Sequence, residues 1–202
     1  MKMTMFIKKA HEKGLVLRDI KPANYLYKPE SDKIKVFGSD LGLSIDISGK
    51  SVAQLKDLLG HQVGTYSYMA PESIKSLRDT TYFKWVQKNS TVDKLTGLFR
   101  LQDSFSLGVS LYELSQGNRP QESCDTICFY GSTSQIGSQC SQLKSGIQNQ
   151  IKGNEQHPRN IFKYWFLMCT EPNLDNRLSV IDLMTEMREY HESLKAKITT
   201  TY

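Results

Sequence analysis

The sequence predicts a mainly α-helical domain with one short β-hairpin, an α+β fold, and three observations lead to that class. Apolar residues recur at helical spacing in segments that begin near residues 3, 103, 160 and 180. Residues 25–27 and 34–37, on either side of a polar turn, have the pattern of short strands. With 202 residues, of which 39% are hydrophobic, the chain is expected to form one domain with a sizeable core.

The first helix is predicted over residues 3–13, where one apolar face repeats at i, i+3, i+4 and i+7. This face consists of Met3, Phe6, Ile7 and Ala10. Gly14 is suited to end the helix, because glycine adopts the left-handed conformation common just after a C-cap.

A polar loop follows, and residues 17–24 read L-R-D-I-K-P-A-N. Pro22 biases Lys21 away from the helical region, so this segment is expected to be irregular. Such a loop can direct the carboxylate of Asp19, the ammonium of Lys21 and the amide of Asn24 at one point. That combination suits an anionic, metal-bound phosphate.

Two further motifs follow the predicted hairpin. Asp40-Leu41-Gly42 offers a carboxylate, which is a hard oxygen ligand suited to Mg²⁺. Residues 64–72 read G-T-Y-S-Y-M-A-P-E, and Pro71 and Glu72 suit the first turn of a helix.

Residues 73–102 are read as an insertion or extended loop, in which residues 80–86 fit either a strand or a helical turn. Residues 103–114 are predicted as a helix buried on most sides, capped at its head by Asp103. Its apolar residues are Phe105, Leu107, Val109, Leu111, Tyr112 and Leu114.

The C-terminal part begins with residues 119–153, which are rich in Ser, Gln, Gly and Asn and predict a surface insertion with a weak helix over 140–151. Residues 160–170 are again helical and apolar. The buried face of the last helix is predicted from Val180, Ile181, Met184 and Met187, before a frayed tail over 196–202.

Composition and charge exclude several classes of function. The formal net charge of +5 is mild and no dense Lys/Arg run carries interleaved aromatics, so no nucleic-acid partner is expected. No apolar run reaches the about 18 residues needed to span a bilayer. Lys8 and Lys9 interrupt any signal-peptide core, so we expect no membrane association and a cytoplasmic, intracellular location.

The cysteines are interpreted as reduced intracellular thiols. Cys124 and Cys128 form a C-x-x-x-C pair that, with Cys140 or Cys169 and with His157, has ligand types found in zinc sites. No second tight ligand pair follows, so no metal–thiolate site is assigned.

In chain order, residues 17–24, 40–42, 64–72 and 103–114 resemble four landmarks of eukaryotic-type serine/threonine protein kinases. These landmarks are the catalytic loop H-R-D-x-x-x-x-N, the D-F-G motif, the segment ending in A-P-E and the central helix D-x-x-S-L-G-V-x-L-Y-E-L. Residues 171–177 also resemble the D-P-x-x-R ending that follows in that family.

The resemblance covers roughly residues 5–190 and implies a kinase-like domain over residues 1–202 that corresponds to the C-terminal lobe alone. It implies an activation segment over residues 43–72. Residues 73–102 and 119–153 would be enlarged loops.

By this resemblance, Asp19 would accept the proton of a substrate Ser or Thr hydroxyl, and Lys21 would contact the γ-phosphate of ATP. Asn24 and Asp40 would hold Mg²⁺, and Thr65 would reach Asp19. ATP and Mg²⁺ are therefore the implied cofactors, and a protein carrying Ser or Thr is the implied partner.

The resemblance also implies structural roles. Glu72 and Arg177 would form a buried ion pair that ties the activation segment to the lower helices. Asp103 would hold the backbone of the catalytic loop.

The sequence departs from the family pattern in identity and in extent. The catalytic-loop His is Leu17, and the D-F-G Phe is Leu41. The chain contains no G-x-G-x-x-G motif and no V-A-I-K strand, so we expect the nucleotide-covering N-terminal lobe to be absent from it. That absence would expose Leu17, Leu41 and the face of the first helix, which a partner could cover.

Two functions from different classes remain. The first is a serine/threonine kinase catalytic lobe that is active once an N-terminal lobe or a partner completes it. The second is a non-catalytic, pseudokinase-like module that binds another protein.

Overall fold

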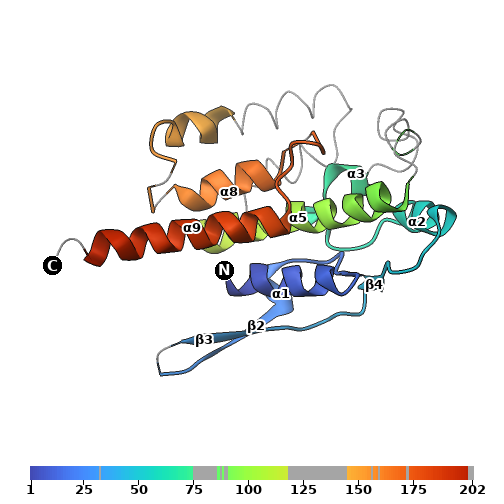
Figure 1. Ribbon diagram of the computed structural model, residues 1–202, viewed down its shortest axis with the longest axis horizontal. Coiled ribbons are helices and arrows are strands. Elements are labelled where there is room, and N and C mark those ends of the chain that lie inside the picture. The colour runs from blue at the N-terminus through green and yellow to red at the C-terminus, as the bar shows by residue number, and fades with distance from the viewer. Residues whose placement is uncertain are drawn as a thin grey trace.

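The chain folds as a body of helices from which one β-hairpin projects (Figure 1). The predicted class, mainly helical with a small β component, is confirmed. None of the helices in the described residues is long and apolar enough to cross a membrane. The computed structural model describes residues 1–31, 33–74, 86, 88, 91–117, 145–155, 157–158, 160–171 and 173–199.

The elements follow one another in the order that the sequence motifs require. The helices are α1 Lys2–Glu12, α2 Val52–Leu59, α3 Pro71–Ile74, α5 Val92–Gln116, α8 Ile161–Cys169 and α9 Val180–Thr199. The strands are β1 Leu15–Val16, β2 Tyr25–Pro29, β3 Ile34–Gly38 and β4 Ile45–Asp46. Two short 3₁₀ turns, η1 Pro22–Asn24 and η2 Tyr66–Tyr68, complete the framework.

The predicted hairpin is confirmed as the antiparallel pair β2–β3, in which Tyr25 lies opposite Gly38. Helix α1 lies between this hairpin and α9 (Figure 1). The ring of Phe6 on α1 meets the ring of Tyr25 edge-on, with centroids 5.9 Å apart. A second two-stranded sheet joins β1 to β4, which brings the chain after residue 42 back beside the end of α1.

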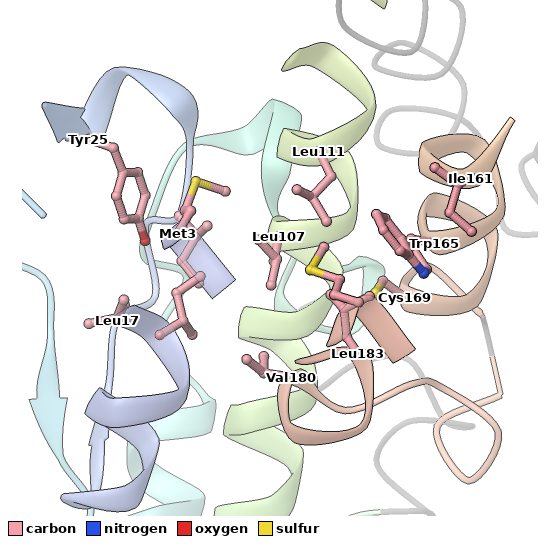
Figure 2. Packing of buried hydrophobic residues seen from close by; sticks show 13 residues of the cluster. Met3, Leu17, Tyr25, Leu107, Leu111, Ile161, Trp165, Cys169, Val180 and Leu183 are labelled. Carbon is pink, nitrogen blue, oxygen red and sulfur yellow. The ribbon is translucent and has the colours of Figure 1, made fainter. Parts of the chain in front are cut away.

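Helix α5 forms the centre of the molecule, and its residues from Asp103 to Leu111 are all buried. Gly108 lets α8 approach closely, because a Cβ atom there would lie 2.6 Å from the Cβ of Cys169. Figure 2 shows side chains from α1, α5, α8 and α9 meeting in one core. The catalytic-loop segment is therefore built directly on the largest hydrophobic cluster.

The predicted start of α5 is wrong by eleven residues, since the helix begins at Val92 and not at Asp103. Thr91 caps it, with its side chain accepting a hydrogen bond from the N–H of Lys94. Residues 92–102, predicted as loop, are helical because Leu95, Leu98 and Phe99 at i, i+3 and i+4 pack against α2. Residues 75–85, 87 and 89–90 of the predicted loop lie outside the described residues.

Helix α2 is an element that the sequence analysis did not predict. It lies inside the expected activation segment and begins with a capping box formed by Ser51 and Gln54. Its apolar residues Leu55 and Leu59 are buried against α5.

Predictions for the C-terminal part are partly confirmed. Residues 145–151 are helical, as expected, while residues 118–144 of the predicted insertion lie outside the described residues. Three of the four residues predicted to face the core from α9 are buried, but Ile181 is 46% exposed. Leu183 takes its place, because i, i+3, i+4 and i+7 counted from Val180 form one helical face.

Three smaller predictions are wrong. Leu114 lies on the outer side of α5 and is 60% exposed. Helix α9 continues to Thr199, so most of the predicted tail is helical. Leu17 was expected to be exposed but is only 6% exposed, because it packs with Met3 and Ile7 of α1.

Candidate active site

The catalytic-loop segment is anchored by a buried carboxylate on the central helix. Oδ2 and Oδ1 of Asp103 accept hydrogen bonds from the backbone N–H groups of Leu17 and Arg18, each at 2.8 Å. Asp103 is 1% exposed and lies within α5, so the prediction that it caps the helix is wrong. The prediction that it holds the loop backbone is confirmed.

His11 is a third partner of this carboxylate and was not singled out from the sequence. Its Nε2 lies 2.8 Å from Oδ2 of Asp103, and its side chain is 2% exposed. A sequence signal did exist, since His11 falls four residues after Ile7 on the apolar face of α1. A polar side chain in an apolar stripe indicates a buried partner.

Replacing His11 by Leu should lower the free energy of unfolding by about 1–3 kcal/mol. The substitution keeps an apolar side chain of moderate volume in place but leaves an oxygen of Asp103 buried with one donor fewer. Urea denaturation measures the change, and His191→Leu on the exposed side of α9 is the control. Equal stability of both variants would contradict the anchoring role of His11.

The anchor holds the loop in an uncommon conformation. Arg18 has φ of 61°, in the left-handed region that residues with a Cβ rarely adopt. Its guanidinium Nε donates to the carbonyl of Leu43 at 2.7 Å, which ties the loop to the start of the expected activation segment. Gly64 then passes so close that a Cβ there would lie 2.4 Å from the carbonyl oxygen of Arg18. This approach brings Thr65 to the loop.

Asp19 is the centre of a network of four residues. Its Oδ1 accepts hydrogen bonds from the N–H and the hydroxyl of Thr65, at 2.9 and 2.7 Å. Its Oδ2 lies 3.0 Å from Nζ of Lys21 and accepts from Nδ2 of Asn24 at 2.9 Å. Lys21 also donates to the hydroxyl of Thr65 at 2.7 Å. The structure therefore brings together four of the five residues singled out from the sequence.

This network keeps Asp19 ionised. Burial alone would raise the pKa of its carboxyl, but hydrogen bonds from Thr65, Lys21 and Asn24 and the charge of Lys21 outweigh burial. The pKa of Asp19 therefore lies below its ordinary value. The site can accept hydrogen bonds from a hydroxyl group and hold it beside an ammonium.

Asp40, the fifth residue, lies apart from this network. It is exposed, has φ of 50°, and its Oδ1 accepts a hydrogen bond from the N–H of Gly42 at 3.4 Å. The backbone of Ser39 donates to the carbonyl of Asn24 at 2.9 Å, so Asp40 follows directly after a residue paired with the catalytic loop. Leu41 is 47% exposed, which confirms that part of the expected apolar surface.

Asn24 and Asp40 fit a magnesium ion by the chemistry of their donors. The amide nitrogen of Asn24 is used by Asp19, so its oxygen is the atom left for a metal, and the carboxylate of Asp40 is exposed. No group of three or more His, Cys, Asp or Glu residues suited to a metal occurs in the described part of the chain. A pair of oxygen ligands completed by water and phosphate is the usual arrangement for Mg²⁺.

The predicted ion pair between the A-P-E glutamate and the C-terminal arginine is confirmed. Nη1 and Nη2 of Arg177 lie 2.5 and 3.2 Å from Oε1 and Oε2 of Glu72. The arginine side chain is 0% exposed and the glutamate side chain 9%. The contact fixes α3 against the segment that leads into α9.

Comparisons with known proteins agree with this geometry. The family described as "Protein kinase domain" matches residues 2–196. The chain belongs to the protein kinase family. Serine/threonine-protein kinase MPS1 of Saccharomyces cerevisiae is 25% identical over 178 residues, which are 88% of this kinase chain and 21% of the relative.

Shorter matches give higher identity. G protein-coupled receptor kinase 2 of Caenorhabditis elegans is 36% identical over 110 residues, and Dual specificity protein kinase TTK of Mus musculus is 31% identical over 110 residues. Each match covers 54% of this kinase chain but only 12% and 11% of the relative. The kinase chain therefore spans a small part of these curated relatives.

A solved structure shows the same fold. A crystal structure of the Rad53 kinase domain and SCD2 in complex with AMPPNP has a TM-score of 0.52 to this kinase chain at 18% sequence identity. The similarity covers 91% of this chain and 54% of that chain. At this identity the likeness establishes the kinase-like fold alone.

Proposed function

We propose that the chain is the C-terminal lobe of a serine/threonine protein kinase that transfers phosphate from ATP to a protein hydroxyl. The observation that carries the proposal is the network in which Thr65, Lys21 and Asn24 surround the carboxylate of Asp19. A lysine two residues after the aspartate, in contact with a threonine from the A-P-E segment, is the serine/threonine pattern. MPS1, a serine/threonine kinase, matches 88% of the chain.

Each residue of the site then has a defined task. Asp19 holds the substrate hydroxyl and receives its proton as the oxygen bonds to the γ-phosphorus and the bond to ADP breaks. Lys21 pairs with the transferred phosphoryl group, and Thr65 keeps both side chains in place. Mg²⁺, held by Asn24 and Asp40, would neutralise charge on the β- and γ-phosphate oxygens.

The face that would meet the nucleotide is apolar and lacks a covering element among the described residues. Leu26 and Phe37 lie opposite each other in the hairpin and are 61% and 50% exposed. Leu41 is also exposed, and because all three lie within three residues of Asn24 or Asp40 along the chain, we infer that they form one apolar surface at the site. We propose that a further protein segment or a partner covers this surface and completes the nucleotide site.

The direct test is transfer of radiolabelled phosphate from ATP to a protein serine or threonine, with loss of transfer when Mg²⁺ is chelated. A second candidate is a non-catalytic kinase-like binding module, which the exposed Leu26, Phe37 and Leu41 favour. Absence of transfer by the protein together with a partner that occupies this surface would support that module instead.

The chain alone should bind Mg-ATP no more tightly than about millimolar, or about −4 kcal/mol. Asn24 and Asp40 supply contacts from one side only, and most of the ligand surface stays solvated. Isothermal titration calorimetry measures the affinity, and Asp40→Asn should abolish what binding remains. Micromolar binding by a monomer would contradict the proposal that a covering segment is needed.

A further inference from the structure

Helices α8 and α9 enclose a groove of about 480 Å³ that the kinase site does not use. Two helical stripes form it, with Tyr164 and Trp165 from α8 and Glu186, Glu189 and Tyr190 from α9. Its volume is that of a typical small-ligand pocket. None of the residues that line the groove belongs to residues 17–24, so the groove and the catalytic loop are separate. In Figure 1, α8 and α9 lie on the opposite side of α1 from the β2–β3 hairpin.

The lining of the groove is aromatic. Trp165 is 4% exposed, and its ring meets the ring of Tyr190 edge-on with centroids 5.8 Å apart. Tyr164 is partly exposed on the α8 side. The faces of tryptophan and tyrosine rings carry negative potential, which attracts an organic cation within about 6 Å.

The lining is also acidic at its centre. Glu186 and Glu189 line the groove together with one lysine, Lys197, which follows Glu186 by eleven residues, or about 16 Å along the helix axis. Burial raises the pKa of Glu186, Trp165 partly opposes the rise, and the charges of Glu189 and Asp182 add to it. A cation placed beside Glu186 would therefore relieve an unfavourable concentration of negative charge.

Two buried polar atoms of the lining lack a hydrogen bond of good geometry within the described structure. They are the indole nitrogen of Trp165 and the hydroxyl oxygen of Tyr190. The indole N–H interacts with the carboxylate of Glu186 without forming such a bond. Figure 2 shows this nitrogen on the side of the ring away from Leu107 and Leu111. Leaving such groups without a partner is unfavourable, and an acceptor oxygen carried by the ligand beside its ammonium group would satisfy them.

We propose that this groove binds an organic ammonium group, carried by a methylated lysine side chain of a protein or by a free quaternary amine such as choline. The partly exposed rings of Tyr164 and Tyr190 would contact the methyl groups, and Glu186 would supply the opposite charge. A methylated ammonium is favoured over an inorganic cation because the lining carries the partly exposed Tyr164 and Tyr190, and no group of three or more metal-ligating His, Cys, Asp or Glu side chains occurs among the described residues. The proposal is independent of nucleotide binding.

The indole N–H signal of Trp165 reports on the groove directly. The sequence has two tryptophans, so Trp85→Phe identifies the Trp165 signal in an ¹⁵N-correlated NMR spectrum of the full chain. We expect a saturable shift of that signal with a trimethyllysine peptide, and a weaker response to the same peptide carrying a neutral tert-butyl group. A shift with free choline alone would identify a small-molecule source of the same chemistry.

Matched variants test the role of charge. Glu186→Gln keeps the shape of the groove and should weaken binding roughly tenfold, as loss of a partly buried charge partner does. Glu192→Gln, which removes an exposed carboxylate 3.1 Å from Lys195 on the same helix, should leave binding unchanged. The proposal is overturned if the Trp165 signal shows no saturable shift, or if the neutral peptide binds as well as the charged one.

Discussion

Replacing Asp19 by Asn should lower the rate of phosphate transfer about 10²–10⁴-fold, the range for loss of a positioned base. The amide keeps the shape of the carboxylate and an oxygen that can accept from Thr65, so the fold should survive. It removes the negative charge that pairs with Lys21 and the atom that receives the hydroxyl proton. Radiolabelled phosphate transfer by the protein with its covering segment or partner measures the effect.

The low pKa of Asp19 limits how strongly its carboxylate can accept a proton. A carboxylate stabilised by Thr65, Lys21 and Asn24 is a weak proton acceptor, so in the proposed role its larger contribution would be to orient the hydroxyl for in-line attack. Because its pKa lies below the ordinary value, Asp19 stays ionised as the pH falls toward about 5. Between about pH 5 and 8, the transfer rate should therefore show no decrease that protonation of Asp19 would cause.

Two controls separate catalysis from stability. Asp93→Asn makes the same change at an exposed position in the first turn of α5 and should leave transfer intact. Nucleotide affinity and melting temperature should be close to those of the parent in Asp19→Asn. An unchanged transfer rate in Asp19→Asn would remove this residue from the proposed role.

The catalytic loop could be predicted because its determinants are local. Pro22 fixes an irregular backbone, and the polar residues around it have no apolar face to bury. The contact between Thr65 and Asp19, 46 residues apart, was predictable only from the resemblance to kinases. Local chemistry identifies the loop, whereas the contacts that shape it come from distant segments.

Distant packing explains the predictions that failed. The spacing of His11 from Ile7 is a signal of burial that the sequence analysis did not use, and no local pattern identifies its partner, which lies 92 residues away on α5. The sequence analysis places the start of α5 too late because Asp103 is a residue type that favours helix caps, whereas Leu95 and Leu98 have helical spacing and lie inside the helix. Leu17 is buried in the cluster that it forms with residues of α1, α5, α8 and α9, and that cluster depends on tertiary structure.

Arg177→Ala should lower the free energy of unfolding by about 3–5 kcal/mol, since removing one partner of a buried ion pair leaves the other charge uncompensated. Besides its two contacts with Glu72, the guanidinium donates from Nε to the carbonyl of Glu171 at 2.8 Å. It also lies over the ring of Phe105, 5.2 Å from the centroid. Arg177→Ala therefore removes the contacts with Glu72, Glu171 and Phe105 together.

The loss should appear in urea denaturation and as a melting temperature lower by roughly 10 °C, given about 2–4 °C per kcal/mol for a chain of this length. Arg188→Ala, on the exposed side of α9, is the matched control and should change stability by less than about 0.5 kcal/mol. These two variants remove the same side chain from one buried and one exposed position.

A double variant distinguishes the cost of an unpaired charge from the worth of the pair. Glu72→Leu combined with Arg177→Met removes both charges and fills the space with apolar groups, so it should recover much of the stability that Arg177→Ala loses. If Arg177→Ala is as stable as Arg188→Ala, the ion pair does not hold the proposed activation segment to the lower helices. If the double variant is no better than Arg177→Ala, the hydrogen bonds to Glu171 and the contact with Phe105 carry the stability instead of the charge pair.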